Sequence, residues 1–298
     1  MKKLILVLFI VYALFGLSNS MLFGTPNATN DFVFHYYSAN GDTTNPEFVE
    51  HYGDGIENYP NLFHILTSPF ASSKLLFYLA MVVLICVIAP IILFKVAGKF
   101  AVWVYFALSL PHMILYNSTF ASFLIIIYFL AYLFFKRKTW AFILFLVLAT
   151  FTHRWGVYFF AIIFVAEVIE KLIRKLTWEK EWKLPQLSLG VGVLAQDKIF
   201  SITKLISVFL NHMNIYFFYL ARKSKDWFYW SLILIGLGGA FIIDFRIIIL
   251  SQISLAIIVG NQLKRNNPSK RFYIICILLM ILNFLSFAIE TEKFLFFN

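Results

Sequence analysis

Apolar residues run along the chain in long stretches that are separated by short polar or basic links. About 20 apolar residues in a helix cross the roughly 30 Å hydrocarbon core of a bilayer, so each stretch predicts a membrane-spanning helix. The runs at 4–23, 75–94 and 272–289 each fit one helix. The runs at 100–135 and 139–170 are too long for one helix. Each of these two predicts a hairpin, with its tip at "LPHMILYNST" or "THRWG".

The remaining apolar stretches complete a prediction of about 11 transmembrane helices in one all-α transmembrane domain, residues 1–298. A weak span at 184–195 and a stronger one at 205–221 precede two spans that flank "IIDFR". Between the hairpins and these spans, residues 171–183 place Trp178 and Trp182 one turn apart among lysines. This pattern is typical of a cytoplasmic interfacial helix.

Composition agrees with a polytopic membrane protein. Of the residues, 61% are hydrophobic and only 13% are charged, and the mean hydropathy is +0.82. The two cysteines, Cys86 and Cys276, lie inside apolar runs, so the sequence predicts neither a disulfide framework nor a cysteine metal site. The basic residues form short clusters next to apolar runs, which argues against a nucleic-acid-binding surface.

The distribution of charge predicts the orientation. On this topology 19 of the 25 Lys and Arg residues face the cytoplasm, together with the N-terminus. The N-terminal run is also similar to a signal peptide, and either interpretation leaves the next segment outside. That segment, the loop 24–73, is long and extracytoplasmic, and it holds six acidic residues and no Lys or Arg. We expect it to contain short juxtamembrane helices.

The loop opens with "TNDFVFHYY", in which Asp31 and His35 are four residues apart. If Asn30 caps a helix here, the two side chains share one helix face. A carboxylate held among aromatic residues at the membrane surface could have a raised pKa and act as a general base. In the simpler alternative, Asp31 only adds favourable charge to a helix N-terminus.

Four further polar residues are candidates on the same side of the membrane. Glu47 shares a predicted helix face with Glu50 and His51, a set that could hold a divalent ion or could simply be solvated. Tyr59 begins a turn that brings His64 to the entry of an apolar segment. His112, at the "LPHMILYNST" tip, is a proton carrier or a polar plug between helices.

Two arginines lie at separate predicted outer tips, Arg154 in "THRWG" and Arg246 in "IIDFR". A guanidinium group offers two parallel hydrogen bonds and a permanent charge, which suits a phosphate leaving group. His153 is the neighbour of Arg154 and could assist. In the alternative interpretation these side chains reach lipid headgroups.

These motifs resemble the GT-C superfamily of membrane glycosyltransferases, which take sugars from polyprenyl-phosphate carriers. "NDFVFHYY" is similar to the acidic opening of that family's first external loop, and "YPNLFHIL" to its Pro-Pro-Leu-type segment. "IIDFRIIILSQISLAI" is similar to its late Arg-containing span. Asp31 is followed by Phe where the family often has a second acid, and Asn61 replaces the second Pro.

The resemblance implies an inverting transfer of a sugar from a polyprenyl-phosphate donor to a glycan, lipid or protein acceptor. Asp31 would be the general base, and His35 would orient it or help to bind a metal such as Mg²⁺ or Mn²⁺. The donor phosphate would be bound by Arg154, Arg246 and His153. An acceptor or loop site would include Glu47, Tyr59, His64 and His112. The active face would be outside the plasma membrane.

Two other functions remain open from the sequence. The segment "LATFTHRWGVYFF" also resembles polysaccharide polymerases of the EpsG or Wzy type, which act on lipid-linked glycans. A non-enzymatic transporter or assembly subunit is the third alternative, and it predicts that Asp31 can be replaced without loss of function.

Overall fold

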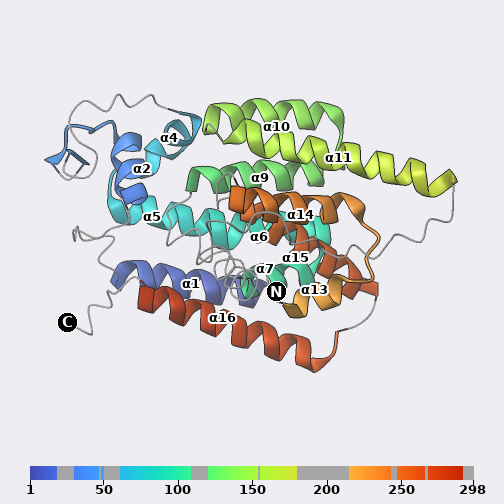
Figure 1. Ribbon diagram of the computed structural model, residues 1–298. Helices are drawn as coiled ribbons and strands as arrows, with labels where there is room; N and C mark the ends of the chain where they lie inside the picture. The colour runs from blue at the N-terminus through green and yellow to red at the C-terminus, as the bar shows by residue number, and fades with distance from the viewer. Residues whose placement is uncertain are drawn as a thin grey trace, which may run out of the picture.

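The computed structural model describes residues 1–18, 30–46, 48–49, 61–108, 120–153, 155–179, 215–242, 247–265 and 268–290. All regular secondary structure in these ranges is helical, which confirms the prediction of an all-helical chain for the described part. Figure 1 shows the helices as a bundle with most axes running along its length.

The helices begin and end close to the limits of the apolar runs. In chain order they are α1 (Lys2–Ser18), α2 (Asn30–Asn40), α4 (Leu62–Thr67), η2 (Ser68–Phe70), α5 (Lys74–Val83), η3 (Leu84–Ile88), α6 (Ala89–Ala97), α7 (Lys99–Ala107), α9 (Phe120–Phe134), α10 (Thr139–Thr152), α11 (Gly156–Glu179), α13 (Ile215–Ala221), α14 (Trp227–Ile242), α15 (Ile248–Arg265) and α16 (Lys270–Glu290).

One helix in the described part is long and apolar enough to cross a membrane. It is the continuous α5–η3–α6 helix, Lys74–Ala97, predicted from the sequence as 75–94. Shorter apolar helices are Phe120–Phe134, Thr139–Thr152 and Trp227–Gly238. The predicted hairpin at 139–170 is present as α10 and α11, with the turn at "THRWG". The total of about 11 spans stays a prediction.

Two predicted elements differ from the structure or lie outside it. Residues 171–179 continue α11 without a break, so they do not form a separate helix. The helix is continuous because Leu, Lys, Arg and Glu, which dominate this segment, are good helix formers, and no Gly or Pro interrupts it. The weak span at 184–195 lies outside the described residues, as do the tips at 109–119 and 243–246.

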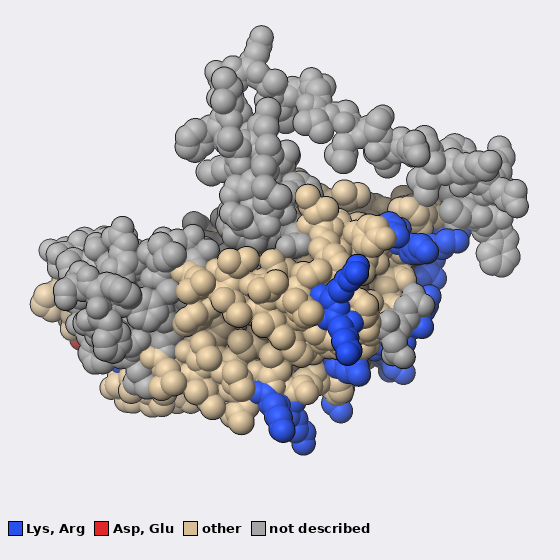
Figure 2. Space-filling model, turned by 90° about the horizontal axis from the view of Figure 1, so that it is seen from below, with Lys and Arg blue, Asp and Glu red and all other residues tan. Residues whose placement is uncertain are grey.

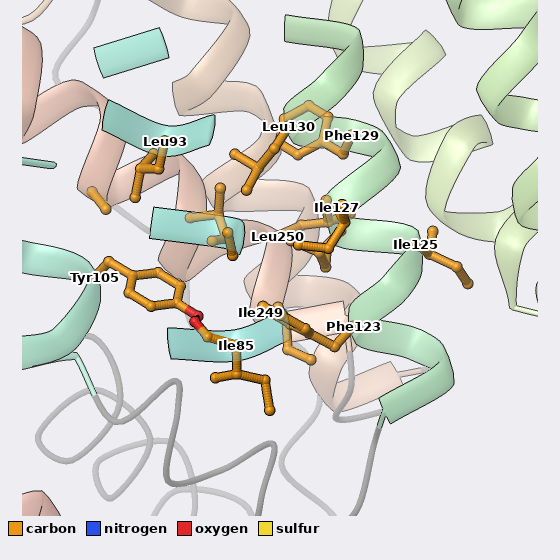
Figure 3. Close-up of a cluster of buried hydrophobic side chains, with 14 of the residues drawn as sticks. Ile85, Leu93, Tyr105, Phe123, Ile125, Ile127, Phe129, Leu130, Ile249 and Leu250 are labelled. Carbon is orange, nitrogen blue, oxygen red and sulfur yellow. The ribbon is translucent and has the colours of Figure 1, made fainter. Parts of the chain in front are cut away.

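Pro90 lies inside the long helix, where a proline would normally break the hydrogen-bond pattern. The helix instead forms a wide π-turn, η3, in which the Ala89 N–H donates to the Leu84 carbonyl. This leaves the Ile85 carbonyl without a helical partner, because Pro90 has no N–H. The Tyr105 hydroxyl of α7 donates to that carbonyl at 2.8 Å, as the close-up in Figure 3 illustrates.

Helix α15 is the centre of the bundle. All its residues from Ile248 to Gly260 are buried, and it packs against α14 on one side and α7 on another. Figure 3 shows its Ile249 and Leu250 facing side chains of α9. Gly260 permits the close approach of α7, because a Cβ at this position would lie 2.9 Å from the Ala101 backbone nitrogen.

The outward faces of several helices expose large apolar side chains. On α1, Leu6, Ile10 and Leu14 repeat at helical spacing and are each about half exposed. Similar residues line α10, α11 and α16, among them Ile143, Val147, Phe164, Val165, Ile274, Leu278 and Leu282. Soluble proteins rarely expose contiguous apolar surface of this extent. The surface is therefore compatible with a membrane environment.

Basic residues gather at one end of the bundle, as Figure 2 shows in blue at the right of the visible face. Two contacts at this end involve basic residues. Arg137, in the α9–α10 turn, pairs with Glu167 and Glu170 of α11. The Lys264 side chain at the end of α15 lies against Gly98 in the α6–α7 turn. Helices α2 and α4 lie at the opposite end of the bundle in Figure 1.

Candidate functional site

The predicted site region contains two buried histidines on neighbouring short helices, α2 and α4. His35 of α2 is 7% exposed, and His64 of α4 is 2% exposed. The His35 ring lies edge-on to Phe63 with 4.9 Å between ring centroids, and Phe34 flanks both histidines. The two imidazoles are therefore enclosed by aromatic side chains.

Helix α2 is held against the bundle by Phe32, one of the largest fully buried side chains. Its ring meets Phe77 of α5 and Phe120 at the start of α9, both in edge-to-face contact. Such contacts contribute about 0.5–1.5 kcal/mol each beyond the burial of area. The aromatic side chains of "FVFHYY" thus fix the position of His35 through tertiary packing.

Asn61 determines where α4 begins. Its side-chain oxygen accepts a hydrogen bond of 3.0 Å from the His64 backbone N–H, which is the usual role of an N-cap residue. Downstream, the Thr67 hydroxyl donates to the Phe63 carbonyl at 2.8 Å. Asn61 therefore sets the backbone position of His64.

His35 Nδ1 and His64 Nε2 are 3.1 Å apart, within hydrogen-bonding distance. The ring centroids are 5.4 Å apart, and the difference of 2.3 Å is about two ring radii. Both nitrogens therefore lie close to the line that joins the ring centres, and each points at the other. This is the alignment of a straight N–H···N hydrogen bond, in which one ring donates and the other accepts.

Burial lowers the pKa of His64 from 6.5 to about 4. The imidazole is consequently neutral at neutral pH, and one of its nitrogens carries no hydrogen. Its second nitrogen, Nδ1, is buried and has no hydrogen-bond partner among the described residues. Buried polar atoms are nearly always paired, so this atom is unusual.

The described pair does not fit a site for Mg²⁺ or Mn²⁺. Its nitrogens point at each other instead of converging on a common point, and these ions prefer oxygen ligands. The part of the chain that the structure describes holds no group of three or more His, Cys, Asp or Glu side chains suited to a metal.

His153 lies in the turn between α10 and α11, half-buried. Its Nδ1 accepts a hydrogen bond of 3.2 Å from the Trp155 backbone N–H, so a neutral His153 ring carries its hydrogen on Nε2. Gly156 completes the turn, since a Cβ there would lie 2.1 Å from the Ala149 carbonyl oxygen. Helix α10 packs against α4, which places this turn at the same end of the bundle as the histidine pair.

The structure brings together only part of the predicted site. Asp31 is in α2, one helical turn before His35, but its side chain is not among those described. Five other predicted site residues lie outside the described residues: Glu47, Tyr59, His112, Arg154 and Arg246. His35 and His64, assigned to separate roles from the sequence, are in direct contact.

Sequence reasoning missed this contact. Asn61, three residues before His64, was a signal in the sequence that could have been used. An N-cap residue predicts the start of a helix, and that helix fixes the backbone position of the histidine. Sequence reasoning also missed the partly buried network of Arg137, Glu167 and Glu170, which the positions of charges inside an apolar hairpin could have indicated. A comparison with protein-family models, curated proteins and solved structures gives no match for this chain.

Proposed function

We propose that the chain is an integral membrane glycosyltransferase that takes a sugar from a polyprenyl-phosphate donor. Its active end would be the extracytoplasmic end, which carries α2, α4 and the α10–α11 turn. The observation that carries this proposal is the contact of His35, on the helix that bears Asp31, with His64 of α4, both enclosed by aromatic side chains. A carboxylate and imidazoles at one membrane surface suit proton removal from a sugar hydroxyl.

Two features of the bundle support the membrane part of the proposal. The exposed apolar faces of α1, α10, α11 and α16 suit contact with lipid chains. The basic residues gather at the end opposite α2 and α4. By the positive-inside rule, the basic end and the N-terminus would lie on the cytoplasmic side of the plasma membrane. The whole bundle would have about 11 spans.

In the proposed reaction Asp31 is the general base for the acceptor hydroxyl. The hydroxyl oxygen attacks the anomeric carbon from the side opposite the phosphate, so the configuration inverts. The leaving polyprenyl phosphate is bound by Arg154 and Arg246. His153 assists them, since its Nε2–H is a donor suited to a phosphate oxygen.

The test is sugar transfer from polyprenyl-phosphate donors in membranes, with Asp31→Asn compared with wild type. Loss of transfer by about 100-fold or more is expected for removal of a general base. Asp42→Asn is the matched control, because Asp42 accepts hydrogen bonds only from Thr44 and Asn45 of its own turn among the described residues. Full activity in Asp31→Asn would sink the general-base role.

A polysaccharide polymerase is the second candidate, and the hydrogen-bond donor of His153 beside Arg154 favours it as much as it favours a transferase. Lipid-linked oligosaccharide donors distinguish the two, since a polymerase would extend them and a transferase of single sugars would not. A transporter or assembly subunit would leave both assays negative in the wild-type protein.

A further inference from the structure

Four exposed basic side chains, the basic patch, gather where α7 begins, α15 ends and α16 begins: Lys99, Lys264, Lys270 and Arg271. Two contacts bring these three helix ends together. The Lys264 side chain lies against Gly98, the residue before Lys99. The ring of Phe272, which follows Arg271, meets the ring of Phe100 edge-on with 6.0 Å between the centroids. The basic patch therefore collects charge from three helices at one place on the surface.

The basic patch has no acidic neighbour along its helices. The sequence holds no Asp or Glu at 58–166 or at 245–289, the ranges that contain α6, α7, α15 and all of α16 except its last residue. Within the described part, no ion pair joins any of the four cations to an acid. Figure 2 shows the blue surface at this end without red beside it on the face in view. Like charges repel one another, so the fold alone does not account for the patch.

The other basic cluster at this end of the bundle is neutralised within the protein. Arg137, in the α9–α10 turn, pairs with Glu167 and Glu170 of α11, and Arg174 also pairs with Glu170. Those cations stabilise contacts between elements of the fold. The basic patch, in contrast, presents its charge to the outside and suits an anion that the described part of the chain does not supply.

An apolar stripe continues from the basic patch along one face of α16. Beyond Arg271, side chains that are each between 49% and 58% exposed recur three or four residues apart: Ile274, Leu278, Leu282 and Leu285. This spacing keeps them on the same helix face as Arg271. Figure 2 views the side on which α1 and α16 lie in Figure 1, and its uncharged surface ends in blue. A ligand that fits both parts has an anionic head and apolar chains.

Aromatic packing fixes the two helix ends that carry most of the basic patch. Trp103, one turn after Lys99, meets Tyr273 edge-on with 5.3 Å between ring centroids, and Tyr273 also contacts Phe100. The Lys99 ammonium lies 4.9 Å from the centre of the Phe100 ring. Trp and Tyr favour the boundary between hydrocarbon and headgroups. The basic patch thus lies beside residues typical of the headgroup level.

We propose that the basic patch binds the phosphate of an anionic phospholipid whose acyl chains lie along the apolar stripe of α16. Arg271 can give two parallel hydrogen bonds to a phosphate, and the lysines add charge. A free anion or an acidic protein would match the cations but leave the stripe uncovered, whereas a lipid matches both. The proposal rests on the membrane part of the proposed function and not on sugar transfer.

The test is binding of phosphatidylglycerol or phosphatidylcholine to the full-length protein in detergent micelles, measured by native mass spectrometry. Wild type should bind phosphatidylglycerol at least about tenfold more tightly. Lys270→Gln/Arg271→Gln removes two exposed charges. Each is worth about five- to sixfold beside an anionic headgroup, so phosphatidylglycerol should bind about 30-fold more weakly. Lys264→Gln changes another helix and should weaken binding about fivefold. Binding of phosphatidylcholine should not change.

Lys136→Gln/Lys138→Gln is the matched control, because it removes two exposed charges at the same end of the bundle, beside the neutralised cluster. Charges that are separated by more than the Debye length of about 10 Å are largely screened. The affinity of this control for phosphatidylglycerol should therefore stay within about twofold of wild type. Equal losses in both double variants would show that binding follows net charge, and would overturn the site.

Two competitors distinguish the lipid from other anions. Neither glycerol 3-phosphate, which has the phosphate without the chains, nor polyglutamate, which imitates an acidic protein surface, should displace phosphatidylglycerol at the lipid's own saturating concentration. Displacement by either would overturn the lipid as the occupant. Equal binding of the two lipids to wild type would overturn the site and leave membrane insertion standing. Binding of neither lipid would overturn it together with the membrane part of the proposed function.

Discussion

The Tyr105 hydroxyl of α7 donates a hydrogen bond of 2.8 Å to the Ile85 carbonyl, which the π-turn before Pro90 has left without a helical partner. Both groups are completely buried. One side chain on a neighbouring helix thus compensates for a proline inside the only described helix of spanning length.

Removal of this hydroxyl tests the compensation. Tyr105→Phe keeps the ring and leaves the buried Ile85 carbonyl unpaired, so we expect a loss of about 1–3 kcal/mol in the free energy of unfolding. Thermal unfolding in detergent micelles measures it. Tyr158→Phe is the control, because Tyr158 is 53% exposed. Equal unfolding temperatures for the two variants would contradict the role of Tyr105.

The sequence alone predicts much of the helical pattern, and its limits have physical reasons. Apolar runs locate α10, α11 and α16 because each run ends at a charged or turn-forming segment. The π-turn in the 75–94 run was not predicted, although Pro90 marks the place where the helical hydrogen-bond pattern is interrupted. The partner of the freed Ile85 carbonyl, Tyr105 of α7, leaves no mark in the local pattern.

The candidate site was predicted only in part, because sequence patterns indicate neighbours along one helix but not contacts between helices. Residues four apart on one helix, such as Asp31 and His35, follow from helical periodicity. The contact of His35 with His64 joins residues 29 apart, and it depends on how Phe32 and Phe63 pack α2 and α4 together. Single-sequence patterns do not encode such packing, so His64 was assigned to a separate role.

The crossing of α7 and α15 gives a second prediction. A Cβ added at Gly260 would meet the Cβ of Ala101 at 2.6 Å and its backbone nitrogen at 2.9 Å. Because the backbone cannot yield as a side chain can, we expect Gly260→Ala to destabilise the protein by about 1–3 kcal/mol. Gly238→Ala in α14 is the matched control, since nothing lies within 4 Å of its added Cβ. It should be neutral or gain up to about 1 kcal/mol of helix propensity.

The partly buried ion network at the basic end gives a third prediction. Arg137 pairs with Glu167 and Glu170, and its guanidinium lies 3.8 Å from the centre of the Phe228 ring. Arg137→Met leaves two largely buried carboxylates without this partner. We expect a loss of about 2–3 kcal/mol, below the range for fully buried pairs because Arg137 is 27% exposed.

Arg174→Met is the control for Arg137→Met in the same denaturation experiment. Arg174 also pairs with Glu170, but its side chain is 74% exposed. Solvent screens such a pair, so we expect a loss below about 0.5 kcal/mol. Similar losses in both variants would show that burial does not set the energy of this network.

The lowered pKa of His64 predicts how stability depends on pH. In the unfolded chain the ring takes up a proton near pH 6.5, but in the folded protein it does so only near pH 4. Between these values the folded state binds fewer protons, so stability falls as the pH falls from about 6.5 to 4. The loss from this group is at most about 3 kcal/mol.

The pH experiment compares wild type with His64→Gln by thermal unfolding at pH 7 and pH 4.5. The variant has no imidazole at this position, so its stability should fall less than that of wild type. The difference between the two proteins at the two pH values isolates His64 from the other titrating groups. Parallel losses would mean that the His64 pKa is ordinary in the folded state.

The proposed orientation predicts which end of the bundle is accessible from outside the cell. Asn40, the last residue of α2, and Lys138, in the α9–α10 turn, are both exposed and lie at opposite ends. The native Cys86 and Cys276 are buried, so the background of labelling should be low. A membrane-impermeant maleimide should label Asn40→Cys in intact cells and Lys138→Cys only after permeabilisation. The reverse pattern would invert the topology and place His35 and His64 on the cytoplasmic side, away from an external glycan acceptor.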